Sequence, residues 1–347
     1  MNYSKNEINK AGIILKDKIN HGPDEIRRAE DILTYWRTIH DAPINTFQAN
    51  IRLKLIQLEK DGFVAQRLKR SPSIITKLLR NKNMKLSTMQ DIAGLRIVLK
   101  NLNDVFTIKQ SLLESKIKHE FIYEDDYINY PKKSGYRSVH LIYKYVNPKI
   151  EESNGLKIEI QIRTKLQHTW ATAVETMGTF IDYSLKSSEG PEKILEFFAL
   201  TGSAFAHLEN CEPIPQYKIL TKNETFTQVI SQFISLGIGE KLRGFTVAAE
   251  HVSKKEAINS KYHLIILNLE KNVVNLIPFS KTNLAAANQA YTEVERQITS
   301  GAKLQAVLVS IDSIKSLKKA YPNYFLDTRE FIDKIDLIKN RLPKLKD

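Results

Sequence analysis

The sequence contains very little cysteine and no long apolar segment. Cys211 is the single cysteine among 347 residues, so no disulfide and no cysteine-based metal cluster can form within the chain. No stretch approaches the roughly 20 apolar residues that a membrane-spanning helix needs, and residues 1–5 lack the apolar core of a signal peptide. There is also no internal repeat and no low-complexity tract. We therefore expect a cytoplasmic protein without a membrane-spanning segment or membrane partner.

The composition is that of a basic globular protein. Hydrophobic residues make up 42% of the chain, which is enough for real cores in two domains, or in one domain with a large appendage. Lys and Arg number 52 against 39 Asp and Glu, giving a net charge of +13. This excess favours polyanionic partners such as nucleotides, RNA, DNA or an anionic membrane. Charge alone is equally compatible with a basic protein that binds none of these.

Three segments follow from the pattern of apolar residues and breaks. Residues 1–60 are predicted to be helical, and residues 61–210 to form the central α+β unit. Pro213 and Pro215 mark a linker, and residues 216–347 are predicted to form a smaller α+β domain. We expect helices there at 226–236, 284–298, 313–320 and 331–338, and strands at 245–249, 263–269, 273–279 and 304–311. This domain has no visible chemistry of its own, so a regulatory or sensing role is expected, with a mere structural extension as the alternative.

Two short polar ladders, 136–140 and 159–163, organise the central segment. Side chains alternate along a strand, so Tyr136, Ser138 and His140 should share one face. Glu159, Gln161 and Arg163 should likewise share a face. Because buried unpaired polar groups are costly, two polar rows indicate a cleft rather than a core. The turn-rich stretch between the ladders predicts an antiparallel pair that forms the floor of an active site.

A basic segment precedes these ladders. Arg67 and Lys69 lie two residues apart, while Ser73 and Lys77 lie four apart and share one face of a predicted helix. Cations beside a helix start form a good phosphate site. A solvated basic helix is the competing interpretation, and it is favoured when this segment is considered alone.

An acid and a basic loop complete the candidate residues. Asp91 stands at the start of a predicted buried strand, where a carboxylate can bind Mg²⁺ or serve in a turn. The loop 130–135 contains Lys132 and Lys133 between proline and glycine. Its composition indicates a turn that faces phosphate.

Taken together, these residues resemble the synthetase domain of the RelA/SpoT family. The resemblance covers about residues 45–180 and depends on the order and spacing of several short motifs. They are Arg67-x-Lys69, Ser73, Lys77, Asp91-x-x-Gly94-x-Arg96, Pro131-Lys132-x-x-Gly135-Tyr136-x-Ser138-x-His140 and Glu159-Ile160-Gln161-Ile162-Arg163-Thr164. Each motif alone is weakly specific, whereas the ordered set is strongly specific.

The resemblance implies a fold, an activity and a set of roles. The fold would be a mixed-sheet, nucleotidyltransferase-like synthetase core flanked by helices. The activity would be a Mg²⁺-dependent pyrophosphokinase that transfers the β,γ-diphosphate of ATP to the 3′-hydroxyl of GDP or GTP, making the alarmone (p)ppGpp of the stringent response. Asp91 and Glu159 would be the catalytic and metal-binding acids. ATP would be bound by Arg67, Lys69, Ser73, Lys77 and Arg96. The acceptor would be bound by Lys132, Lys133, Tyr136, His140, Gln161, Arg163 and His168, with Tyr136 stacking on its base.

Several alternatives stay open within the resemblance. Toxins of the same family, which place pyrophosphate on the 3′ end of tRNA, share these motifs, and so would an enzyme that makes adenosine alarmones. A domain that binds nucleotide or RNA without reacting is a further alternative. The sequence does not decide whether a protein trigger or inhibitor binds residues 216–347, or whether the chain forms a homo-oligomer.

Overall fold

A computed structural model of the chain describes residues 3–181, 183, 185, 188–244, 260–271, 273–280, 282–310 and 327–342. The strand predicted at 245–249 and the helix predicted at 313–320 lie outside the described residues. In the described part of the chain, no helix is long and apolar enough to cross a membrane.

Eight strands form one mixed sheet in the order β3-β4-β5-β2-β1-β8-β6-β7. The central segment contributes β1 (Gly62–Leu68), β2 (Ala93–Leu99), β3 (Glu120–Asp126), β4 (Val139–Lys144) and β5 (Lys157–Thr164). The C-terminal segment contributes β6 (Ser260–Asn268), β7 (Val273–Ser280) and β8 (Leu304–Ser310). Strands β2 and β5 are parallel, and the remaining pairs are antiparallel. The predicted α+β class, with a mixed sheet flanked by helices, is confirmed.

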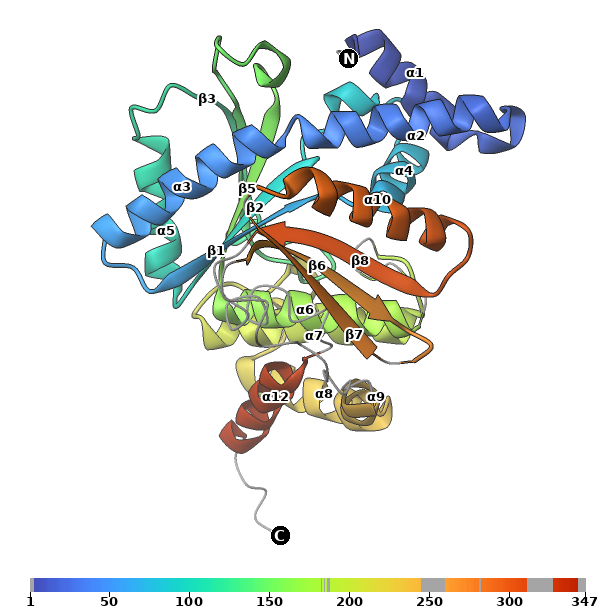
Figure 1. The fold of residues 1–347 in the computed structure, drawn as a ribbon. Coiled ribbons are helices and arrows are strands. Elements are labelled where there is room, and N and C mark those ends of the chain that lie inside the picture. The colour runs from blue at the N-terminus through green and yellow to red at the C-terminus, as the bar shows by residue number, and fades with distance from the viewer. Residues whose placement is uncertain are drawn as a thin grey trace.

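Helices cover both faces of this sheet (Figure 1). The N-terminal helices are α1 (Lys5–Lys16), α2 (Pro23–Thr38) and α3 (Asp41–Gln57), followed by α4 (Ser71–Arg80) and α5 (Leu102–Leu113). Next come α6 (Lys165–Phe180), α7 (Glu192–Leu208), α8 (Lys222–Ser235) and α9 (Ile238–Gly244). The last two that the structure describes are α10 (Leu284–Thr299) and α12 (Arg329–Arg341). Helices α3 and α5 lie on one side of the sheet, and α6 and α7 lie on the other (Figure 1).

Strand β5 shows how the sheet separates its core face from its polar face. Ile158, Ile160 and Ile162 are fully buried in the cluster that also contains Phe47 and Ile51 of α3. Because side chains alternate along a strand, the residues between these isoleucines must point to the opposite face. The hydrophobic core on one side thereby fixes where Glu159 and Gln161 point.

The C-terminal strands join the same sheet as the central ones. Strand β8 pairs with β1, placing Gln66 opposite Ser310 and Arg67 opposite Val309. Helix α12 buries Phe331 and Ile335 in a cluster shared with α6 and α7. The hydrogen bonds and core contacts of residues 216–347 are therefore not confined to that segment. The division at 1–60, 61–210 and 216–347 stays a prediction about which parts fold alone.

One predicted ladder is shorter in the structure. Strand β4 begins at Val139, so Tyr136 and Ser138 precede it. Ser138 is fully buried, and its hydroxyl donates to the carbonyl of Ile162 at 3.1 Å instead of facing a cleft. The predicted pairing of the two segments is nevertheless confirmed, because His140 of β4 lies opposite Gln161 of the antiparallel β5.

Candidate active site

A cleft of about 310 Å³ lies where β1, β2, β4 and β5 meet. Nine of the residues predicted from the sequence line it, and they come from separate parts of the chain. These are Arg67, Lys69, Lys77, Asp91, Arg96, Lys132, His140, Glu159 and Gln161. A larger and more open groove of about 790 Å³ lies between α2 and α10, and no predicted site residue lines it.

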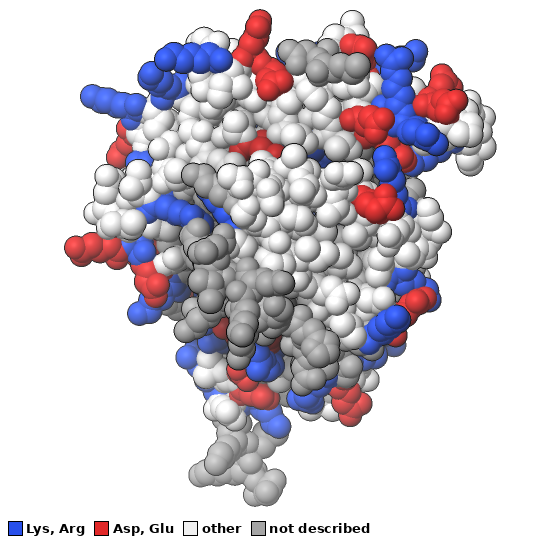
Figure 2. Space-filling model, viewed as in Figure 1, with Lys and Arg blue, Asp and Glu red and all other residues white. Residues whose placement is uncertain are grey.

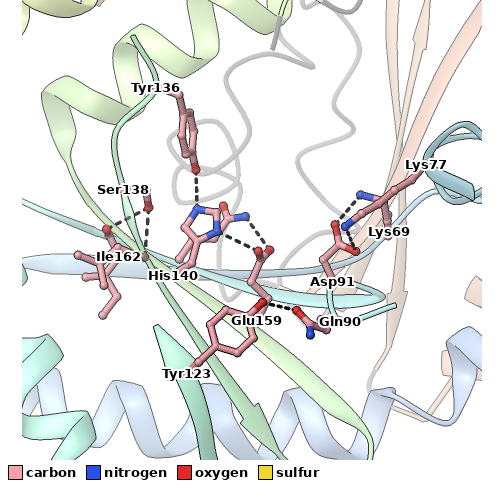
Figure 3. Close-up of polar contacts among 12 residues, drawn as sticks. Lys69, Lys77, Gln90, Asp91, Tyr123, Tyr136, Ser138, His140, Glu159 and Ile162 are labelled. Atoms are coloured by element: carbon pink, nitrogen blue, oxygen red, sulfur yellow. Dashed lines mark hydrogen bonds and ion pairs between the residues drawn. The ribbon is translucent and has the colours of Figure 1, made fainter. Parts of the chain in front are cut away.

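Asp91 lies between two lysines on one side of the cleft (Figure 3). Lys69 follows β1 and places its Nζ 2.8 Å from Oδ2 of Asp91, while Lys77 reaches from α4 to within 2.9 Å of Oδ1. Burial alone would raise the pKa of Asp91, but the two ammonium groups outweigh it and lower this pKa to about 2. The carboxylate is therefore ionised at every physiological pH.

Glu159 is held by polar neighbours on the other side of the cleft (Figure 3). The Nδ1 atom of His140 lies 3.0 Å from Oε1 of Glu159, and the amide of Gln161 donates to Oε2 at 2.8 Å. Gly94 is paired with Glu159 across the parallel strands, and without a side chain it leaves the carboxylate uncovered. Burial would raise the pKa of Glu159, but the charge of His140 outweighs it, so this pKa is lowered.

His140 links this carboxylate to Tyr136. The Tyr136 hydroxyl lies 2.8 Å from Nε2 of His140, on the side of the ring away from Glu159. Burial lowers the pKa of His140, yet the two partners outweigh burial and raise it to about 9. The imidazole is therefore cationic at neutral pH, and both of its nitrogens carry protons.

Four further polar residues that line the cleft were not predicted: Gln90, Tyr123, Asp125 and Tyr127. Tyr123 donates to the side-chain oxygen of Gln90. The Lys132 ammonium lies 4.2 Å from the centroid of the Tyr127 ring, and burial together with Asp125 raises the pKa of that tyrosine. The alternation of residues 123, 125 and 127 along β3 and just past its end was the signal that could have revealed them.

Five predicted residues do not line the cleft: Ser73, Lys133, Tyr136, Arg163 and His168. Arg163 and His168 are buried and hydrogen-bonded to each other. Burial, together with the charge of Arg96, lowers the pKa of Arg163 to about 9. Ser73 is half-buried in the first turn of α4, and Lys133 is exposed. The roles expected for these five stay predictions.

The loop that carries Lys132 rests on α7. Gly135 has a φ of +90°, a conformation that favours glycine. A Cβ atom added to Gly202 of α7 would lie 2.7 Å from the Gly135 carbonyl oxygen. Glycine at both positions lets the loop and the helix approach this closely, and the loop thereby holds Lys132 at the edge of the cleft.

The acids of the cleft fit a magnesium ion. No group of three or more His, Cys, Asp or Glu side chains is arranged to hold a metal in the part of the chain that the structure describes. Magnesium is usually bound by one or two carboxylates together with waters and substrate phosphates. Asp91 and Glu159 line the same cleft and offer hard oxygen ligands of this kind.

The central segment of the chain is similar to known proteins. Residues 66–180 match the family model described as "Region found in RelA / SpoT proteins". The GTP pyrophosphokinase YjbM of Bacillus subtilis is 38% identical over 138 residues, which are 38% of this chain and 61% of YjbM. YwaC of the same organism, also called a GTP pyrophosphokinase, is 34% identical over 112 residues, which are 30% of this chain and 52% of YwaC. The chain thus spans half to three fifths of these curated relatives.

Among solved structures, the small alarmone synthetase 1 of Bacillus subtilis bound to its product pppGpp is similar to this chain. It shares 28% sequence identity, with a TM-score of 0.45, over 51% of this chain and 93% of that one. All of the residues predicted for the site, from Arg67 to His168, lie inside the segment that the family model matches. Residues 66–180 of this chain are similar to the region found in RelA and SpoT proteins.

Proposed function

We propose that the chain is a Mg²⁺-dependent pyrophosphokinase that transfers the β,γ-diphosphate of ATP to the 3′-hydroxyl of GDP or GTP. The observation that carries the proposal is the cleft itself, in which Asp91 and Glu159 lie among basic residues from three strands, a helix and two connecting segments. Phosphoryl-type transfer depends mainly on positioning and on neutralising charge. The names of YjbM and YwaC, both GTP pyrophosphokinases, support the same reaction.

The donor would be bound by the basic side of the cleft. In the structure Lys69 and Lys77 neutralise Asp91. The phosphates of ATP would offer these lysines a more highly charged anion, and the Asp91 carboxylate would then be available to hold Mg²⁺. The metal would supply neutralisation of the phosphate oxygens on which charge develops.

The acceptor would lie against β4 and β5. Its 3′-oxygen attacks the β-phosphorus of ATP, a new O–P bond forms, and the bond from this phosphorus to the α,β-bridging oxygen breaks, so AMP leaves. The proton of the 3′-hydroxyl passes to Glu159, which His140 keeps ionised. In a loose transition state the attacking oxygen loses its proton late, so a carboxylate of lowered pKa suffices. Lys132 would meet the 5′ phosphates of the acceptor.

Transfer of label from [γ-³²P]ATP tests this proposal. The protein is incubated with GDP, GTP, ATP and tRNA at equal concentration, with Mg²⁺ or with EDTA. We expect labelled guanosine products that disappear with EDTA and fall at least about 100-fold in Glu159→Gln. The matched control is Glu114→Gln, a change at an exposed glutamate of the C-cap of α5 that should keep wild-type activity.

The other outcomes assign other functions. Dominant labelling of tRNA or of ATP would replace the guanosine acceptor. If wild type and Glu159→Gln both bind ATP but show equally negligible transfer to all four acceptors, the protein is a binding module and not an enzyme.

A further inference from the structure

A carboxylate from the C-terminal part of the chain holds the start of helix α4. Oε1 of Glu295, on α10, accepts a hydrogen bond from the backbone N–H of Ser71 at 2.9 Å. Oε2 accepts a second from the Ser71 hydroxyl at 2.7 Å and lies 2.8 Å from Nη1 of Arg37. The surface over β8 is largely uncharged in Figure 2, and the Glu295 side chain is only 7% exposed.

This contact completes the first turn of α4. The first N–H groups of a helix lack partners within the helix, and a carboxylate there both accepts their hydrogen bonds and complements the helix dipole. The N-cap residue, Arg70, provides no side-chain cap, and Pro72 has no N–H to donate. Glu295 supplies the capping acceptor from 224 residues along the chain.

A buried arginine compensates the charge of Glu295. Arg37, on α2, has a side chain only 4% exposed, and it also donates to the Ser71 hydroxyl at 3.1 Å. Its guanidinium lies 4.8 Å from the ring centroid of Tyr291, one helical turn before Glu295 on α10. Removing one member of a buried ion pair leaves the other charge unpaired, so each charge here requires the other. The cluster therefore joins α2, α4 and α10.

The face of α4 that Glu295 holds is opposite the face that serves the cleft. A helix turns about 100° per residue, so Ser73 and Lys77 lie about 200° and 240° around the axis from Ser71. Lys77 points into the cleft and pairs with Asp91. Glu295 thus supports α4 from behind without entering the space that phosphates would occupy.

The same C-terminal segment also holds the other element of the donor side. Strand β8 pairs with β1 at Gln66 and Arg67, and Lys69 follows this strand. We infer that Glu295 is a positioning residue for ATP, acting through α4 and its Lys77. The inference rests on the proposed function, because it assigns the donor to this side of the cleft.

The test compares Glu295→Gln with Glu293→Gln. Both residues lie on α10, but the Glu293 side chain is 60% exposed and serves as the matched control. Loss of the capping charge is expected to raise KM for ATP about five-fold while changing KM for the guanosine acceptor less than about two-fold. The control should leave both constants unchanged. Equal rises in the two KM values, or none, would overturn the inference.

A double variant separates positioning from stability. Replacing Arg37 and Glu295 together by Met removes both buried charges, which often leaves stability unchanged. We expect its melting temperature to stay near that of wild type, while KM for ATP stays raised as in Glu295→Gln. A wild-type KM for ATP in this variant would show that only the ion pair mattered and would refute the inference.

Binding of a non-hydrolysable ATP analogue, measured calorimetrically, keeps the inference distinct from the proposed function. A wild-type protein without transfer activity would refute the function alone. In that case an affinity for the analogue about five-fold weaker in Glu295→Gln than in Glu293→Gln would support the positioning role, and equal affinities would refute it. If Glu295→Gln does not fold, Ser71→Pro replaces it, because proline lacks the N–H that donates to Glu295 and suits the first turn of a helix. Weakened ATP binding is again expected, and unchanged binding would refute the inference.

Discussion

The proton on His140 should make the stability of the protein depend on pH in a narrow window. Tyr136 and Glu159 flank the ring and raise its pKa from the ordinary 6.5 to about 9, although burial opposes this. Between these two values the folded protein holds a proton that the unfolded chain has already released. Stability from this group is complete below pH 6.5 and is lost as pH rises toward 9.

The size of the effect follows from the width of the window. Each rise of one pH unit between the two pKa values lowers the free energy of unfolding by about 1.4 kcal/mol. From pH 6.5 to 8.0 the loss should therefore be about 2 kcal/mol. Above pH 8 the lowered pKa of Tyr136, about 8 against an ordinary 10, begins to act in the opposite direction. The interval from 6.5 to 8.0 is thus the one in which His140 acts before Tyr136.

The other described histidines with shifted pKa values act in the opposite direction. Burial lowers the pKa of His40, His119, His207 and His263, so each adds stability as pH rises through the ordinary value of 6.5, and part of this gain extends above 6.5. Cys211 has a pKa raised above its ordinary 9 by burial, so it titrates beyond the interval. Because these groups are the same in wild type and in a His140 variant, the difference between the two proteins in their change of stability from pH 6.5 to 8.0 isolates His140.

Urea unfolding at fixed ionic strength provides the assay. Between pH 6.5 and 8.0, wild type should lose about 2 kcal/mol more unfolding free energy than His140→Asn, which cannot take up the proton. The control His21→Asn, at a partly exposed histidine, should behave as wild type. Equal losses in all three proteins, or an NMR titration of His140 with a midpoint near 6.5, would refute the reasoning.

Three more changes test other parts of the molecule. Asp91→Asn should destabilise the nucleotide-free protein by about 2 kcal/mol, because it removes the carboxylate whose pKa Lys69 and Lys77 lower to about 2. Thermal unfolding checks this, and an unchanged melting temperature contradicts it. Gly202→Ala should lower the free energy of unfolding by about 1–3 kcal/mol and raise the acceptor KM, since its Cβ would meet the backbone of Gly135. Stability and KM equal to those of wild type would argue against the contact. Ile160→Ala, in the core, should lower the free energy of unfolding in urea by about 2–5 kcal/mol. The control Ile56→Ala, at a residue 72% exposed, should lower it by almost nothing. Similar losses in the two variants would show that burial does not determine the loss.

Local patterns were sufficient to predict the parts of the site that lie on regular strands. Alternation alone places Glu159 and Gln161 on one face, because the isoleucines between them are buried. The same rule failed at Ser138, since a turn through Gly135 delays the start of β4 until Val139. A pattern of residue types shows periodicity, but it does not show where strand pairing begins.

Contacts between distant segments could not be predicted in this way. The bond between Glu295 and Ser71 joins residues 224 positions apart, and no local pattern encodes it. The extra strands β6, β7 and β8 were predicted, yet their attachment to β1 was not, because pairing partners depend on tertiary packing. Tyr123 and Tyr127 were missed for a different reason: they show a strand alternation, but aromatic residues on a strand usually indicate a core.

The position of β1 inside the sheet has a consequence for how the protein is made. Its partner β2 is synthesised soon after it, but β8 emerges only when positions 304–310 leave the ribosome. Until then one edge of β1 has no strand beside it, and an open edge invites pairing with other chains. Closing so long a loop is also slow. A nascent chain can therefore contain every residue of the cleft while β1, which carries Arg67, is paired only with β2. The pairing of β8 with the open edge of β1 should be among the last events of folding.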